Sequence, residues 1–144
     1  MSMQTQRSPN EFGANLRCPP DTVDDAHDFL AQVWVQRPDV TPDDRMVMET
    51  ATSELVTNVV KENRHRLLTC NLMVTVDTDL LVLEVSDDGE AVPEALPAVT
   101  MPAAEAESGR GLVLIRLIGD DLSYRRVDSR NVWRVEKLRA PKGP

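Results

Sequence analysis

The feature that most limits how this chain folds is a pair of short alternating segments near its middle, "CNLMVTVDTDLLVLEVSDDG". In residues 72–76 and 81–85 an aliphatic side chain occupies every second position, as in strands that bury one face. Between them lies Asp77-Thr78-Asp79, and aspartates favour turns. The segment therefore predicts an antiparallel β-hairpin.

Two amphipathic helices are predicted before this hairpin. Residues 19–36 place apolar side chains at helical spacing, with Asp21 as the expected N-cap. A second helix is expected to begin after Thr41, which is a capping residue, with Pro42 at the first helical position. It should run to about Asn63. Helices followed by strands indicate an α+β protein.

The segments after the hairpin complete this architecture. The stretch "GLVLIRLIGDD" predicts a third helix that stops at Gly119. Alternating residues in 122–127 and 131–138 predict two closing strands, and 14–19 a short first strand. We expect a two-layer α/β sandwich whose sheet is mixed but mostly antiparallel, with the helices on one face.

The length of 144 residues suits one domain. We expect a flexible arm over 1–13, the domain over 14–139 and a tail over 140–144. Residues 90–108 contain three prolines and six alanines and little periodicity, which is typical of a loop or lid.

Charge and composition exclude several classes of function. The net charge is −8, with 24 acidic and 16 basic residues, which argues against direct nucleic-acid binding. It is compatible with a basic protein partner or simply with solubility. No apolar run is long enough to span a membrane, and the amino end lacks a signal-peptide pattern, so we expect a cytoplasmic protein. The cysteines and histidines lack the spacing of zinc ligands.

Glu54 and Asn58 lie four residues apart in the second predicted helix and therefore share one face. An amide oxygen is a hard ligand suited to Mg²⁺, and a carboxylate can orient or deprotonate a nucleophile. Lys61 and Glu62 continue this face. The same pattern is also typical of an ordinary solvated helix face.

"VSDDGEAVP" places Asp87 at the end of a strand and Gly89 two residues later. A carboxylate there can accept a hydrogen bond from an exocyclic amine such as that of adenine, while the glycine lets the backbone approach a ring. An acidic turn after a strand is also common without any ligand. A calcium loop is excluded because the ligand spacing is absent.

"SGRGL", residues 108–112, opens the third predicted helix with two glycines. Gly109 and Gly111 permit backbone conformations that other residues avoid. The N–H groups at a helix start then form a site for phosphate. An ordinary junction between a loop and a helix explains the pair equally well.

The order of these motifs resembles the GHKL ATPase family, whose Bergerat fold is shared by sensor histidine kinases and gyrase-type ATPases. More narrowly, the chain is similar to the small bacterial anti-sigma-factor serine/threonine kinases. "SELVTNVVKE" resembles their N box, "VSDDGEAVP" and "SGRGLVLI" their two glycine boxes, and "NVWRVEKL" their final strand. The resemblance covers residues 15–138 and implies the histidine-kinase-like ATPase fold.

The resemblance implies a role for each motif residue. Glu54 would be the catalytic general base, and Asn58 would hold Mg²⁺ against the phosphates of ATP, with Lys61 nearby. Asp87 would bind the adenine amino group in a pocket shaped by Gly89 and Ala91. The remaining expected contacts are with the phosphates: Ser108, Gly109, Arg110, Gly111 and Leu112.

Three positions depart from the family pattern. Ala91 stands where relatives have the second glycine of the first glycine box. Glu62 stands where many have His, and Asn131 where many have Thr. None of these removes the expected base, metal or adenine residue.

Two functions follow from the resemblance. The first is an ATP-dependent kinase that phosphorylates a serine or threonine of an anti-anti-sigma (STAS-type) antagonist and sequesters a sigma factor, as a homodimer. Glu54 favours this reading. The second is a protein-binding switch of the same fold without ATP turnover, which Ala91 and Glu62 favour. An unrelated α+β domain with chance motifs is the remaining alternative. The sequence does not identify the sigma factor, the antagonist or the phosphorylated residue.

Overall fold

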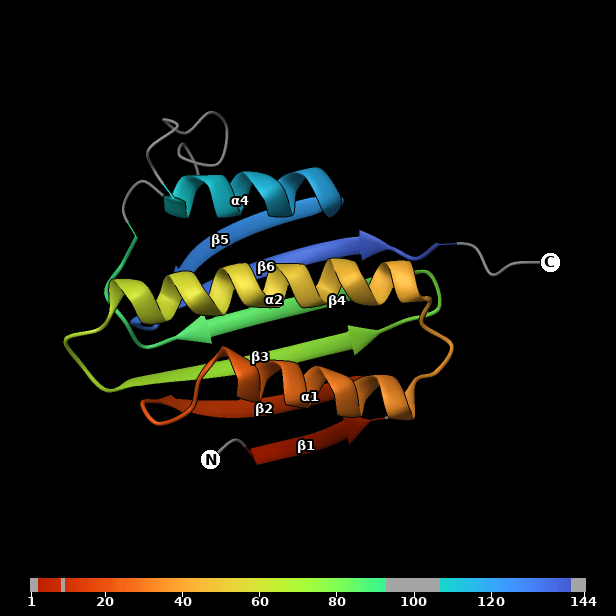
Figure 1. The fold of residues 1–144 in the computed structure, drawn as a ribbon, viewed down its shortest axis with the longest axis horizontal. Helices are drawn as coiled ribbons and strands as arrows, with labels where there is room; N and C mark the ends of the chain where they lie inside the picture. The colour runs from red at the N-terminus through yellow and green to blue at the C-terminus, as the bar shows by residue number, and fades with distance from the viewer. Residues whose placement is uncertain (1–2, 9, 93–106, 141–144) are drawn as a thin grey trace.

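The computed structural model describes residues 3–8, 10–92 and 107–140. These residues form one sheet of six strands in the order β1-β2-β3-β4-β6-β5, and the helices lie on one face of it (Figure 1). The elements follow the chain in this order: β1 (Met3–Ser8), β2 (Glu11–Cys18), α1 (Val23–Gln36), α2 (Pro42–Glu62), β3 (Leu68–Val76), β4 (Leu80–Asp87), α4 (Glu107–Ile118), β5 (Asp121–Val127) and β6 (Arg130–Leu138).

The predicted α+β sandwich with helices on one face is confirmed. The β3–β4 hairpin is present and longer than predicted, with Val76 opposite Leu81 at its closed end. Every pair of neighbouring strands in the described chain is antiparallel, so the parallel pair expected of a mixed sheet is not found there. The reason is that β6 inserts between β4 and β5 and separates the two strands that run in the same direction.

The amino end differs from the predicted loose arm over 1–13. β1 pairs with β2, and β2 pairs with β3, beginning at Glu11. Phe12, Ala14 and Leu16 alternate toward the core of the protein, so the apolar pattern of β2 starts before residue 14. β1 joins through main-chain hydrogen bonds, which require no apolar pattern.

The helix starts confirm one predicted cap and correct the other. Thr41 caps α2 by accepting the Asp44 N–H at 3.2 Å, and Pro42 is the first helical residue. At α1 the cap is Thr22, whose N–H donates to Asp25 in a capping box. Asp21, the predicted cap, is buried and accepts the Arg17 N–H instead. No helix in the described ranges is long and apolar enough to cross a membrane.

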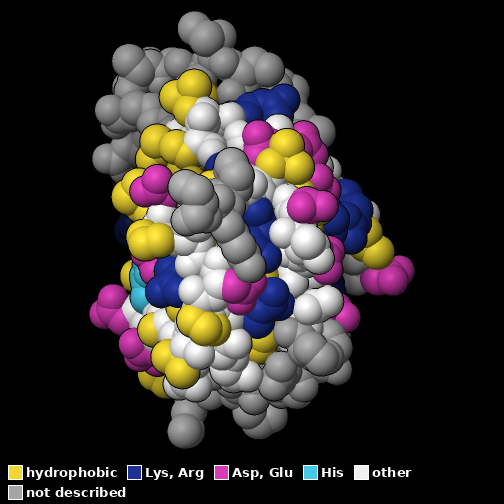
Figure 2. All heavy atoms as spheres, turned by 90° about the vertical axis from the view of Figure 1, so that its right-hand side faces the viewer, with side chains coloured by type: hydrophobic (Ala, Val, Ile, Leu, Met, Phe, Trp, Pro, Cys, Tyr) yellow, Lys and Arg dark blue, Asp and Glu magenta, His cyan; other side chains and the backbone are white. Residues whose placement is uncertain are grey.

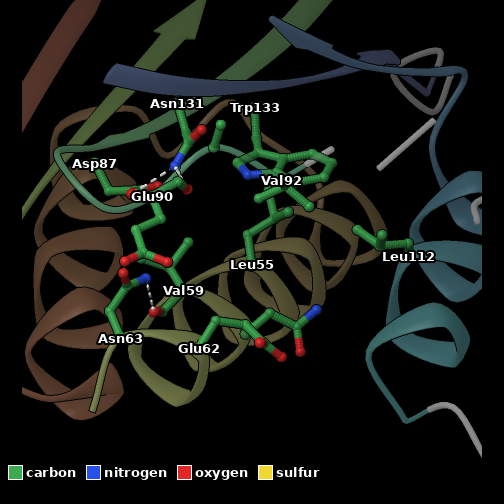
Figure 3. Close-up of a pocket in the computed structure, with 12 residues that line it drawn as sticks. Leu55, Val59, Glu62, Asn63, Asp87, Glu90, Val92, Leu112, Asn131 and Trp133 are labelled. Atoms are coloured by element: carbon green, nitrogen blue, oxygen red, sulfur yellow. Dashed lines mark hydrogen bonds between the residues drawn. The ribbon is translucent and has the colours of Figure 1, made fainter. Parts of the chain in front are cut away.

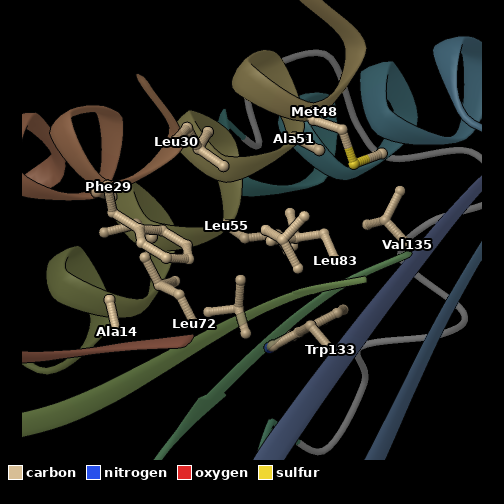
Figure 4. Close-up of a cluster of buried hydrophobic side chains, with 14 of the residues drawn as sticks. Ala14, Phe29, Leu30, Met48, Ala51, Leu55, Leu72, Leu83, Trp133 and Val135 are labelled. Carbon is tan, nitrogen blue, oxygen red and sulfur yellow. The ribbon is translucent and has the colours of Figure 1, made fainter. Parts of the chain in front are cut away.

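The core lies between the helices and the sheet (Figure 4). Leu30 and Phe29 of α1 and Leu55 of α2 face Leu72 and Leu83 from the central strands, and all five are almost fully buried. With 3% aromatic residues in the chain, aliphatic side chains provide most of this packing. The core fixes α2 over the sheet and so positions the motif residues of that helix.

A cluster of charges joins the helix layer to the sheet at the end where β6 stops. Asp39 accepts from Arg37 at 3.0 Å and from Arg139 at 2.8 Å. Hydrogen bonds from the two guanidinium groups hold the pKa of the Asp39 carboxyl well below its usual range. Figure 2 faces this end of the molecule, where acidic and basic side chains are mixed rather than segregated.

Candidate functional site

A pocket opens between α2, the turn that follows β4, and the inner face of β6 (Figure 3). The described residues enclose about 200 Å³ there. The lining residues come from four parts of the chain: Leu55, Asn58, Val59, Glu62 and Asn63; Asp87, Glu90, Ala91 and Val92; Leu112; and Asn131 and Trp133. Six of these side chains are apolar and six are polar, so the pocket combines apolar surface with several polar groups that could orient a small molecule.

Asp87 is the most unusual polar group in this pocket. Its side chain is 1% exposed. Oδ1 accepts hydrogen bonds from the Gly89 N–H at 2.8 Å and from Asn131 Nδ2 at 3.0 Å. Oδ2 is buried and has no hydrogen-bond partner among the described residues. Burial raises the pKa of the Asp87 carboxyl, while the two donors act in the opposite direction. A buried acceptor without a donor is costly, and a ligand with an N–H group would satisfy it.

There is no room for a side chain at the position of Gly89. A Cβ at this position would lie 2.5 Å from Oδ1 of Asn63, whose amide donates to the Val59 carbonyl at 2.7 Å. No glycine in the described chain has a positive φ. The backbone at Gly89 therefore approaches the C-cap of α2, and the turn closes against that helix.

Gly111 leaves room for the end of the Glu54 side chain. A Cβ there would collide with Oε2 of Glu54 and lie 3.6 Å from Nδ2 of Asn58. The predicted pair on α2 therefore does share one face, and that face is directed at the first turns of α4. Because Gly111 has no side chain, α4 packs close to the Glu54 carboxylate.

Comparison with protein-family models matches residues 17–137 to the histidine kinase-like ATPase domain. The chain belongs to this family. Comparison with curated proteins gives no match. The histidine kinase-like ATPase domain implies ATP binding. Asp87, the residue predicted to bind adenine, lines the pocket. Magnesium, the phosphorylated group and any partner are not fixed by this membership.

The structure brings together most of the predicted residues of this ATPase domain. Asn58, Asp87, Ala91 and Leu112 line the pocket, and Glu54 lies beside it against Gly111. Lys61 is directed elsewhere, because it lines a separate groove beside the start of α1. Glu62, which stands where many relatives have His, lines the pocket, whereas Lys61 does not.

The second glycine box is positioned differently from the prediction. α4 begins at Glu107, so Ser108, Gly109 and Arg110 already belong to its first turn. The glycines do not precede the helix in a special backbone conformation. The predicted lid over 90–108 lies mostly outside the described residues, which resume at Glu107.

Ala91 replaces a family glycine without backbone strain. It is exposed, and it is not among the residues with positive φ in the described chain, which are Asp128 and Ser129. Alanine is therefore compatible with the conformation of this turn. The departure at Ala91 does not by itself argue against a bound nucleotide.

Sequence reasoning missed several residues of the site. Asn131 was noted only as a departure, yet it is the side-chain partner of Asp87. Trp133 lines the pocket and packs on Tyr124 with 4.7 Å between ring centroids. The alternation of β6 was the available signal, because residues 131, 133 and 135 all face the helices. Asn63 had no such signal.

Proposed function

We propose that the chain is an ATP-binding regulator of the anti-sigma-factor type. It phosphorylates a serine or threonine of an anti-anti-sigma antagonist and sequesters a sigma factor. The observation that supports the nucleotide assignment is Oδ2 of Asp87, a buried acceptor with no donor among the described residues, at a pocket that is half lined by apolar side chains. The exocyclic amine of adenine would supply that donor, and Leu55, Val59 and Trp133 would provide apolar surface for the base.

Asn58, which lines this pocket, and the start of α4 would hold the phosphates. Glu54 and Asn58 converge on Gly111, where Nδ2 is the nearer atom of the Asn58 amide. The oxygen of the same amide is a hard ligand of the kind that Mg²⁺ accepts together with phosphates. The residues present therefore fit the ion, with Asn58 as its protein ligand. When bound, Mg²⁺ neutralises phosphate charge. The first turn of α4 presents main-chain N–H groups to the phosphates.

Glu54 is the proposed base for phosphoryl transfer. Its carboxylate accepts the proton of the antagonist's hydroxyl as that oxygen bonds to the γ-phosphorus and ADP leaves. Such transfer depends mainly on positioning and charge neutralisation. The carboxylate lies against Gly111, next to the helix start that would meet the phosphates.

The partners rest on the sequence resemblance. An antagonist of STAS type and a sigma factor are the partners that the small anti-sigma kinases suggest, with a homodimer as the assembly. The net charge of −8 suits a basic protein surface as partner.

A switch without turnover is the second candidate, and the position of Glu62 favours it. This carboxylate lines the pocket where many relatives have a histidine, and it places negative charge near an anionic ligand. On this view the chain binds its partners, and nucleotide affinity is weak.

Two measurements separate these functions. Titration calorimetry with ATP and Mg²⁺ is expected to show saturable binding, and absence of binding at millimolar ATP would favour the switch. Incubation with γ-labelled ATP and a STAS-type antagonist is expected to label the antagonist. Glu54→Gln should retain ATP binding and lose labelling. Labelling that persists in this variant would remove Glu54 from the mechanism.

A further inference from the structure

The turn that carries Asp87 is held by side chains from the β5–β6 hairpin. Nη1 of Arg126 donates to the Gly89 carbonyl at 2.8 Å and to Oδ1 of Asn131 at 3.0 Å. The Tyr124 hydroxyl accepts the Val92 N–H at 3.1 Å. Asn131 adds a hydrogen bond from Nδ2 to the Glu90 carbonyl at 2.8 Å. Side chains that are distant in sequence thus bind main-chain groups of Gly89, Glu90 and Val92.

These contacts determine which way the Asn131 amide faces. Because the Tyr124 oxygen accepts the Val92 N–H, its own proton is available for Oδ1 of Asn131, 2.5 Å away. Arg126 can only donate. With two donors on Oδ1, the amide N–H₂ must face Asp87 and the Glu90 carbonyl. The reversed amide would place its oxygen against a carboxylate oxygen.

The orientation of the amide in turn determines which oxygen of Asp87 is free. Nδ2 of Asn131 and the Gly89 N–H both donate to Oδ1. Oδ2 is left as the acceptor for a ligand. If the amide rotated or the turn shifted, the free oxygen would no longer have a fixed position in the pocket.

The neighbouring arginine has a different role. Arg125 lies on the opposite face of β5, 3.8 Å from Glu84 in an exposed ion pair. Arg126 has no carboxylate within 4.0 Å in the part of the chain described here. Its side chain donates hydrogen bonds to the Gly89 carbonyl and to Asn131. The two residues therefore form a matched pair for comparison, with the same charge and adjacent positions.

We propose that Arg126 and Tyr124 are positioning residues for adenine selectivity, which act by orienting Asn131 and the turn after β4 so that Oδ2 of Asp87 meets the exocyclic amine. This inference rests on the proposed nucleotide binding. It predicts an effect on the choice between bases, which general loss of stability would not produce. Neither residue belongs to the motifs that suggested the site.

The test compares ATP with inosine triphosphate, which has a carbonyl in place of the amine, by calorimetry with Mg²⁺. The native protein is expected to prefer ATP. Arg126→Gln and Tyr124→Phe should weaken ATP about threefold to tenfold each and leave inosine triphosphate nearly unchanged, which is the scale of one lost hydrogen bond. Arg126→Lys should recover part of the preference, and Arg125→Gln should retain all of it.

Equal weakening of both nucleotides, or no change in either, would overturn the proposal. Failure of the native protein to bind either nucleotide would instead refute the proposed function. In that case amide hydrogen exchange in the nucleotide-free protein decides the structural claim. Val92 should exchange faster in Tyr124→Phe than in Arg125→Gln, and equal rates would refute the positioning role.

Discussion

Replacement of Asp87 by Asn is the most informative change, because it should separate binding from stability. The substitution keeps the shape of the side chain. The new amide oxygen can still accept from Gly89 and Asn131, as Oδ1 does now. The amide nitrogen would then take the place of Oδ2 and present a donor to the adenine amine, which is also a donor.

The expected loss of affinity follows from one hydrogen bond to a charged acceptor. Such bonds contribute about 1.5–3 kcal/mol, so ATP should bind about tenfold to a hundredfold more weakly. Calorimetry with ATP and Mg²⁺ measures this directly. Asp88→Asn is the matched control, because Asp88 bonds the Thr69 N–H and does not line the pocket.

Asp87→Asn should weaken ATP binding, but it should not lower the stability of the fold. Because the pKa of Asp87 is raised in the folded protein, its ionised form is disfavoured by folding. The native protein should therefore gain stability as the pH falls through this raised pKa, and lose that gain as the pH rises. Asp87→Asn removes the buried charge, so its melting temperature at neutral pH should equal or exceed that of the native protein. Unchanged ATP affinity would refute the adenine assignment, and a large fall in melting temperature would refute the account of the buried charge.

Three further changes test other parts of the structure. Gly111→Ala should change the stability by less than about 1 kcal/mol in thermal unfolding, because the Glu54 carboxylate can move away from the new methyl group and alanine favours a helix. It should instead slow phosphoryl transfer by displacing Glu54, and a larger loss of stability would refute this account. Ser129→Gly should stabilise by about 0.5–1 kcal/mol in chemical denaturation, because Ser129 has a φ of 63° in the β5–β6 turn; no gain would refute the strain assigned to it. Asp39→Asn should cost about 2 kcal/mol at neutral pH and progressively less below about pH 4, because the ionised Asp39 contributes fully above the ordinary pKa of an aspartate and loses that contribution as the pH falls toward the lowered pKa of the folded protein. A constant difference from pH 7 to pH 3, measured by urea unfolding, would contradict that assignment.

Local patterns were enough to predict the elements that bury one face. The β3–β4 hairpin and the start of α2 follow from alternation and from Thr41 and Pro42, which act within a few residues. β1 was missed because its sequence has no apolar alternation, and it is held by pairing with β2. The cap of α1 was placed one residue early, since Asp21 and Thr22 are both good capping residues and only the fold selects between them.

The site was predictable where its residues are close in sequence. Glu54 and Asn58 share a helix face because of their spacing, and Asp87 ends a strand that the alternation defines. The partners of Asp87 were not predictable in this way, because Asn131 follows it by 44 residues and meets it only through the pairing of β4 with β6. The glycines illustrate the same limit. The sequence suggested freedom of φ for Gly111 and approach of a ligand ring for Gly89, whereas in the structure side chains from α2 occupy the space where a Cβ of either residue would lie.

The place of the β5–β6 hairpin in the chain has a consequence for biosynthesis. Asp87 leaves the ribosome well before Tyr124, Arg126 and Asn131, because synthesis proceeds from the amino end, whereas a domain generally folds as a unit. A nascent or truncated chain that stops before Tyr124 contains every residue of the N box and both glycine boxes but none of the side chains that orient Asp87. Such a chain also lacks β6, the strand between β4 and β5. Nucleotide binding should therefore require the β5–β6 hairpin, and fragments that carry the motifs but stop before Tyr124 should not compete for ATP with a protein that contains it.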